Sequence, residues 1–269
     1  MIKKRSTHAT SSLKTAIFFI SIVVVVLVIA ISVKVVETMQ KSIFDGQHQF
    51  ILLFQSPQNK ATLVAIDPSD TQLSALYITN PKQESIQKDI PLGIDATIQT
   101  NLTINTVKDI QHVLLASASM LSNQKHTNIT WYDFLRLYFI AKTMNTATIT
   151  EYHITLPANQ TDIESAEKRF IDPSLQKESA PIQIINASDI TGKASSLEVL
   201  LNNTGYSVID VRTNPTVDTF SVIRYYGTIS YSLKKLQRIL GYPIRQVHQQ
   251  MIGAIQIVIG KDANRFAQF

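Results

Sequence analysis

An uninterrupted apolar run near the amino terminus constrains this chain more than any other feature. Residues 16–33 (AIFFISIVVVVLVIAISV) contain no charged residue, no proline and no glycine. At 1.5 Å rise per residue, a helix of this length covers about 27 Å, which is close to the hydrocarbon thickness of a bilayer. In water such a run would aggregate, whereas in lipid a helix satisfies every backbone polar group internally. The run therefore predicts one transmembrane helix.

The charges on either side of this run predict its orientation. Residues 1–15 hold four basic residues and no acidic one, while both signs of charge follow the run. By the positive-inside rule, residues 1–15 form a cytoplasmic basic arm and the chain after the helix is extracytoplasmic. A cleaved signal peptide is the alternative, since Ala30-Ile31-Ser32 fits a small-x-small cleavage site. The run is longer than a usual signal-peptide core, which favours a single-pass signal anchor in the cell membrane.

Composition excludes several classes of protein. Cysteine is absent, which rules out a disulfide framework, a thiolate metal site and a cysteine nucleophile, and which fits a bacterial envelope that works without disulfides. The formal net charge of +5 lies mostly beside the membrane: residues 37–181 carry 11 basic and 15 acidic side chains, and residues 182–269 carry 9 and 5. No basic stripe with interleaved aromatic residues occurs, so nucleic acid is not an expected partner.

The middle of the chain predicts an α+β domain over residues 45–170. Two turn segments rich in Pro, Asn and Asp separate three strand-like runs, which predicts an antiparallel meander over residues 49–55, 61–66 and 72–79. Residues 81–101 have no regular pattern. Helices are expected at residues 104–121, at residues 131–144 with Thr130 as N-cap and Asp133 three residues later, and in a short segment from Thr161. Residues 172–181 are polar and bounded by proline, which predicts a linker.

The last third of the chain alternates between strand and helix patterns. A strand is expected at residues 182–186, a helix from residue 191 that ends at Gly205, and strands at residues 206–212 and 219–226. A second helix, residues 231–240, ends at Gly241 and precedes a short strand and a final apolar strand at residues 255–259. This βαββαβ order predicts a compact domain with helices on one face of a small sheet, and the whole chain is expected to be an α+β protein.

These C-terminal residues carry a family resemblance. The opening IQIINASDITGKASSLEVLLNNTGYSVIDV, the middle segments FSVIRYYG and SLKKLQRILG, and the ending IQIVIGKD resemble the LytR C-terminal domain over residues 182–262. The usual opening of that domain is a strand followed by N-G-S-G-x-x-G-x-A. Ala187 and Asp189 replace two of its glycines, and the matching residues are Asn186, Ser188, Gly192 and Ala194. The resemblance implies a bacterial envelope protein of the LytR–CpsA–Psr-associated kind.

Two places in this segment are candidate binding sites. Asn186, Ser188 and Gly192 lead into a helix N-terminus, whose free backbone N–H groups can hold a phosphate or carboxylate; alternatively, Asn186 and Ser188 cap the turn. Lys234, Lys235 and Arg238 lie on one side of the second helix and could meet an anionic wall polymer or lipid headgroups. The alternative for these three is a solvated helix face.

The first domain shows no complete catalytic motif. Residues 49–79 resemble the start of the LytR–CpsA–Psr catalytic domain, which attaches glycopolymers to the cell wall. That family needs arginines at a lipid pyrophosphate, whereas this chain has Asn59-Lys60-Ala61-Thr62 and Asn80-Pro81-Lys82 at the corresponding turns, and no arginine between Arg5 and Arg136. Lysine does not reproduce the bidentate arginine contact with phosphate. The resemblance therefore implies a lost active site, and we expect no catalytic residue, metal site or cofactor.

Three functions remain after this reading. The first is a non-enzymatic envelope protein that presents a LytR C-terminal-like module in cell-wall polymer assembly or maintenance, with an anionic wall polymer or envelope proteins as partners. The second is a divergent glycopolymer phosphotransferase, which would need arginines distant in sequence, such as Arg136 and Arg169, to rebuild a pyrophosphate site. The third is an extracytoplasmic scaffold for another membrane protein.

Overall fold

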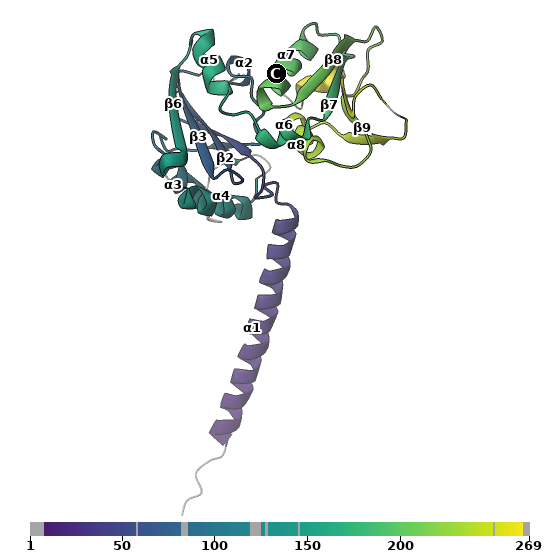
Figure 1. Ribbon diagram of the computed structural model, residues 1–269. Helices are drawn as coiled ribbons and strands as arrows, with labels where there is room; N and C mark the ends of the chain where they lie inside the picture. Colours follow the sequence, from purple (N-terminus) through teal and green to yellow (C-terminus); the bar gives the residue numbers. More distant parts are fainter. Residues whose placement is uncertain are drawn as a thin grey trace, which may run out of the picture.

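One long helix carries two sheet-containing lobes at its carboxyl-terminal end (Figure 1). The computed structural model describes residues 8–57, 59–81, 86–118, 125–126, 129–144, 146–249 and 251–265. We call residues 43–171 the N-terminal lobe and residues 172–265 the C-terminal lobe. The first seven residues of the expected basic arm and the expected end of a helix at Leu121 lie outside the described residues.

Helix α1 (His8–Gln40) contains the predicted transmembrane segment and extends beyond it at both ends. Within the described part of the chain it is the one helix long and apolar enough to cross a membrane, over Thr15–Gln40, and no part of its apolar window is buried against the rest of the protein. The helix continues past residue 33 because neither glycine nor proline occurs before Gly46.

The N-terminal lobe is built on a six-stranded sheet. Strands β1 (Phe50–Ser56), β2 (Lys60–Asp67) and β3 (Gln72–Thr79) pair antiparallel in sequence order, which confirms the predicted meander. β4 (Ala96–Gln99) pairs parallel to β1, β6 (Ile149–Thr155) pairs parallel to β3, and β5 (Lys125–His126) lies outside β4. The expectation that residues 81–101 are irregular was wrong for β4, since four residues are too few to show a period of two.

Helices cover both faces of this sheet. α3 (Val107–Ala118) and α4 (Trp131–Thr143) share one apolar core with the strands, while α2 (Ile86–Asp89) and α5 (Gln160–Glu167) contribute to a second core on the other face. A strand buried on both sides reads as a continuous apolar run rather than an alternation. The capping box predicted at the start of α4, between Thr130 and Asp133, is present.

The C-terminal lobe has the predicted βαββαβ elements. Its helices α7 (Lys193–Thr204) and α8 (Tyr231–Leu240) end at glycines in the left-handed conformation, Gly205 and Gly241. Its five strands lie in the order β10-β9-β11-β7-β8, namely β10 (Ile244–Val247), β9 (Val222–Tyr226), β11 (Ile255–Ile259), β7 (Pro181–Asn186) and β8 (Ser207–Thr213). Single 3₁₀ turns occur at Thr146–Thr148 and Lys261–Arg265.

The segment expected to be a linker instead contains helix α6 (Pro173–Glu178). Asp172 caps this helix through hydrogen bonds from the backbone N–H groups of Ser174 and Leu175, and proline occupies the first helical position, where it costs nothing. The side chain of Leu175 is buried in the core of the C-terminal lobe. Helices α6, α7 and α8 lie on the side of the sheet that faces the N-terminal lobe (Figure 1).

Candidate functional site

The segment that follows helix α1 is fixed to the N-terminal lobe by α4. Besides capping α4, the buried carboxylate of Asp133 accepts hydrogen bonds from the Ser42 hydroxyl and from the backbone N–H of Phe44. The guanidinium of Arg136 donates to the carbonyl oxygens of Phe44 (2.6 Å) and Asp45 (2.8 Å). Residues 42–45 are therefore held in one geometry directly after α1.

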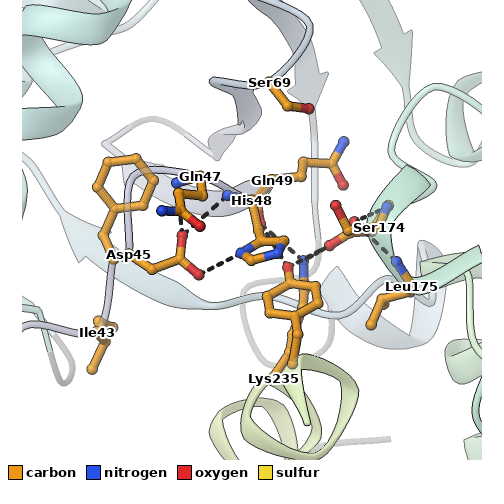
Figure 2. A network of polar contacts seen from close by, with 12 residues as sticks. Ile43, Asp45, Gln47, His48, Gln49, Ser69, Ser174, Leu175 and Lys235 are labelled. Atoms are coloured by element: carbon orange, nitrogen blue, oxygen red, sulfur yellow. Dashed lines mark hydrogen bonds and ion pairs between the residues drawn. The ribbon is translucent and has the colours of Figure 1, made fainter. Parts of the chain in front are cut away.

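A fully buried lysine from the C-terminal lobe reaches the same region. The Nζ of Lys235 lies 2.7 Å from the Asp172 carboxylate and 3.5 Å from that of Asp95, and it donates to the carbonyl oxygen of Gln49 at 3.1 Å. All three ionic side chains are completely inaccessible to solvent. Figure 2 shows Lys235 rising from α8 toward the segment that carries His48 and Gln49. The lysine therefore connects both lobes in a region without water access.

Arg238, one turn further along α8, completes the charge balance. Its Nη2 lies 3.1 Å from Asp95, and its Nη1 donates to the carbonyl oxygen of Ile43 at 2.8 Å. The other oxygen of Asp95 accepts from the backbone N–H of Ile51 at 2.9 Å. Two carboxylates thus oppose two cations, which is the condition under which buried charges are tolerated.

Aromatic rings cover this group of charges. The Tyr231 hydroxyl donates to Asp172 at 2.6 Å, and the Tyr231 ring stacks on His48 with the ring centroids 3.8 Å apart. The Nδ1 of His48 lies 2.6 Å from the carboxylate of Asp45. We call Asp95, Asp172, Tyr231, Lys235 and Arg238 the interlobe cluster.

Burial and neighbouring charges shift the pKa of two members of the cluster, Tyr231 and Arg238. Burial raises the pKa of the Tyr231 phenol far above its usual range, and the neighbouring Asp172 carboxylate raises it further, so the phenol stays a hydrogen-bond donor. Burial alone would lower the pKa of Arg238, but Asp95, together with the Tyr231 and Tyr206 phenols, raises it by more, and the pKa of the guanidinium rises. Each charged side chain of the cluster has a partner of opposite charge, and the cluster holds the two lobes together.

The structure separates the three basic residues predicted on α8. Lys234 is exposed, whereas Lys235 is buried in the interlobe cluster and Arg238 is bonded to Asp95. The expectation that the three share a side of the helix was wrong, because consecutive positions are rotated by 100° and only Lys234 points to solvent. Polymer or headgroup binding by these residues stays a prediction, in which Lys234 is the one accessible cation.

The predicted turn before α7 is closed on itself. The Asn186 side-chain oxygen accepts from the Ser188 hydroxyl (2.6 Å) and backbone N–H (3.1 Å), and the Asn186 amide donates to the carbonyl oxygen of Ile190. Gly192 has φ +86° and begins α7 without a side-chain cap. Asn186 and Ser188 are thus used in the turn, as the alternative interpretation held, and anion binding at these residues stays a prediction.

The arginines required by the phosphotransferase hypothesis lie at different places. Arg136 is bonded to backbone carbonyl groups in the segment after α1, while Arg169 lines a cavity of about 300 Å³ with Lys168 and Asp67. Arg169 therefore lies at this cavity without Arg136, whereas the phosphotransferase hypothesis requires both arginines at one pyrophosphate site. Within the described ranges, no group of three or more His, Asp or Glu side chains is arranged to hold a metal ion.

Sequence reasoning missed Asp95, Asp172 and Tyr231. For Asp172 a signal was present, since an acid followed by proline is a common helix start. For Lys235 the signal was its place among Ser232, Leu236 and Leu240, the positions that α8 buries. No local pattern marks Asp95, because its cationic partners, Lys235 and Arg238, lie in the other lobe and far away in sequence.

Comparison with known proteins identifies the C-terminal lobe. The family described as "LytR cell envelope-related transcriptional attenuator" (LytR_C) matches residues 179–262. No curated protein matches the chain. Among solved structures, the Lin1025 protein from Listeria innocua is 8% identical over 81% of this chain and 95% of its own, with a TM-score of 0.19, a likeness too weak to support an argument. The match to the family agrees with the predicted motif, and residues 179–262 therefore belong to the LytR C-terminal domain family.

Proposed function

We propose that this protein is a single-pass membrane protein of the bacterial cell envelope that holds a LytR C-terminal domain outside the membrane, where the domain engages anionic wall polymer during cell-wall assembly or maintenance. The N-terminal apolar helix and the family match support a membrane-anchored envelope protein. The proposal adds that wall polymer is the ligand, that the domain lies outside the membrane, and that the protein is not an enzyme.

The interlobe cluster is the observation that carries this proposal. A flexible tether would suffice to keep a domain near a membrane, but here Lys235 and Arg238 bond the C-terminal domain to residues 43–49, directly after the membrane helix. Buried ion pairs are weak sources of net stability, and in some proteins they specify a unique geometry. A fixed orientation relative to the membrane suits a protein that presents one surface to an extended polymer.

The orientation can be tested by cysteine labelling, because the chain has no cysteine of its own. A single Lys234→Cys variant exposes a thiol on the C-terminal lobe, and a Ser11→Cys variant places one on the basic side of the apolar run. A membrane-impermeant maleimide applied to intact cells should label the first and not the second. The reverse pattern would contradict the proposed orientation.

Wall binding is tested with the full chain in nanodiscs of zwitterionic lipid. The protein should co-sediment with purified cell walls that carry anionic polymer and lose this binding when the polymer is stripped chemically. Retention of other envelope proteins without any wall binding would favour the scaffold function. The phosphotransferase alternative has less support, since Arg136 and Arg169 are not brought to one site.

A further inference from the structure

The C-terminal sheet has two faces with opposite character. Ile182, Ile184, Ile223 and Ile257 are buried beneath the helices. Because side chains alternate along a strand, the residues between them point to the other side, which no helix of the core covers. The helices on the first side also contact the N-terminal lobe, through Lys235 to Asp95 and through Thr204 to the backbone of Gly93. The second side, which we call the outer face, therefore points away from the N-terminal lobe.

A row of polar side chains crosses the whole outer face. Strand pairing places one residue of each strand in register, in the order Arg245, Arg224, Gln256, Gln183 and Asp210. Four inter-strand spacings of about 4.8 Å make this row about 19 Å long. A polar row of this length on a sheet face is long enough to contact several units of an extended ligand.

Hydrogen bonds fix four of the five side chains of this row, from Arg224 to Asp210. Arg224 donates to Gln256 at 3.1 Å, the Gln256 amide donates to Gln183 at 2.6 Å, and the Gln183 amide donates to Asp210 at 2.7 Å. Arg212 then pairs with Asp210 at 2.8 Å. Ordering these long side chains before a ligand arrives lowers the conformational entropy lost on binding.

The charge of the row is uneven. Asp210 is compensated by Arg212, but among the residues that the structure describes no carboxylate forms an ion pair with Arg224 or Arg245. Arg245 is exposed, and Tyr226, which follows Arg224 on the same face of β9, exposes about half of its surface (49%). Two uncompensated guanidinium groups beside an exposed aromatic ring match a ligand with both anionic groups and sugar rings.

We infer that the outer face of the C-terminal sheet, along the row from Arg245 to Asp210, is the binding site for an anionic glycopolymer. The inference rests on the proposed function and gives it a location that differs from the turn before α7 and from α8. Arg245 and Arg224 contact the phosphate or carboxylate groups, Tyr226 packs against a sugar ring, and the Gln256 amide contacts a hydroxyl group. Gln183 is buried and positions Gln256 from beneath the ligand.

The test compares matched variants of the full chain in zwitterionic nanodiscs. The probes are poly(glycerol phosphate), neutral dextran, and vesicles that contain phosphatidylglycerol. The double variant Arg224→Gln/Arg245→Gln removes the charges and keeps side-chain length, and Lys108→Gln/Lys177→Gln removes the same charge from exposed positions on α3 and α6. Thermal unfolding of each variant controls for folding. We expect the arginine variant to bind poly(glycerol phosphate) at least tenfold more weakly and the lysine variant to stay within twofold of the wild type. Polymers too short to span the row should bind less tightly than longer ones.

The outcomes separate this inference from the proposed function. Wild-type binding that the arginine substitutions leave unchanged would overturn the outer-face site while polymer binding stands. No binding of poly(glycerol phosphate) or of wall material by the wild type would overturn both. Tighter, arginine-dependent binding to the anionic vesicles than to the polymer would show a lipid-binding face and overturn the assignment to a glycopolymer.

Discussion

Replacing Lys235 with methionine is the most direct perturbation of the interlobe cluster. Methionine keeps the length of the side chain and removes its ammonium group, which lies 2.7 Å from Asp172 and 3.5 Å from Asp95. At an effective dielectric constant of about 20, the attraction to Asp172 alone is about 6 kcal/mol before desolvation is subtracted. Because the variant leaves a buried carboxylate without its cation, we expect a loss of about 3–5 kcal/mol in the free energy of unfolding.

Two optical signals make the assay specific for the lobes. The chain has one tryptophan, Trp131, at the start of α4, so its fluorescence reports on the N-terminal lobe, whereas far-ultraviolet circular dichroism reports on both lobes. In the wild type we expect the two denaturant transitions to coincide. In Lys235→Met we expect them to separate, with a drop in Tm of about 6–20 °C.

The neighbouring Lys234→Met variant is the control, since Lys234 is exposed on the same helix and should change stability by less than about 0.5 kcal/mol. Adding Asp172→Asn to Lys235→Met should cost less than the sum of the two single changes, because both remove one interaction. If Lys235→Met costs under about 1 kcal/mol and the two transitions stay together, the cluster does not hold the lobes, and the argument for a fixed orientation fails.

Three other changes test separate features of the structure. Tyr231→Phe removes the hydroxyl that donates to Asp172 at 2.6 Å and should cost about 1–2 kcal/mol in chemical denaturation; a variant as stable as the wild type would contradict a stabilising role for this hydrogen bond. Gly205→Ala forces a side chain into φ +111° with its Cβ 2.9 Å from the Asp172 carbonyl oxygen, so we expect a loss above about 1 kcal/mol and a lower Tm; an unchanged Tm would contradict this. Burial, assisted by Glu164, raises the pKa of Glu167 to about 7, so the native state binds more protons than the unfolded state between its ordinary pKa and about 7, and stability should fall as pH rises through this window. Glu167→Gln should flatten that slope, and an equal slope in both proteins would refute the assignment.

The local patterns of the sequence identified the elements that short-range chemistry determines. The apolar run predicted helix α1. Thr130 and Asp133 predicted the start of α4, and Gly205 and Gly241 predicted the ends of α7 and α8. The cap signals depend on residues within about one helical turn of each other, and the apolar run is contiguous in sequence. The strands of the meander were recognisable because burial on both faces makes them apolar throughout.

The elements that were missed depend on distant partners. β4 and β6 pair in parallel with strands far away in sequence, and their own residues are too few or too polar to predict a strand. The row on the outer face was likewise not readable, because its five residues come from five strands and meet only through the register of the sheet.

The sequence by itself determined that this chain has a membrane-spanning length of apolar helix and a LytR C-terminal domain, because both are encoded in contiguous residues. Only the tertiary structure decided what the charged residues do. Lys234 and Lys235 are adjacent and chemically identical, yet Lys234 is exposed to solvent and Lys235 is buried between Asp172 and Asp95. That difference arises from a rotation of 100° along α8 and from two carboxylates that folding brings to Lys235, Asp172 from the same lobe and Asp95 from the other.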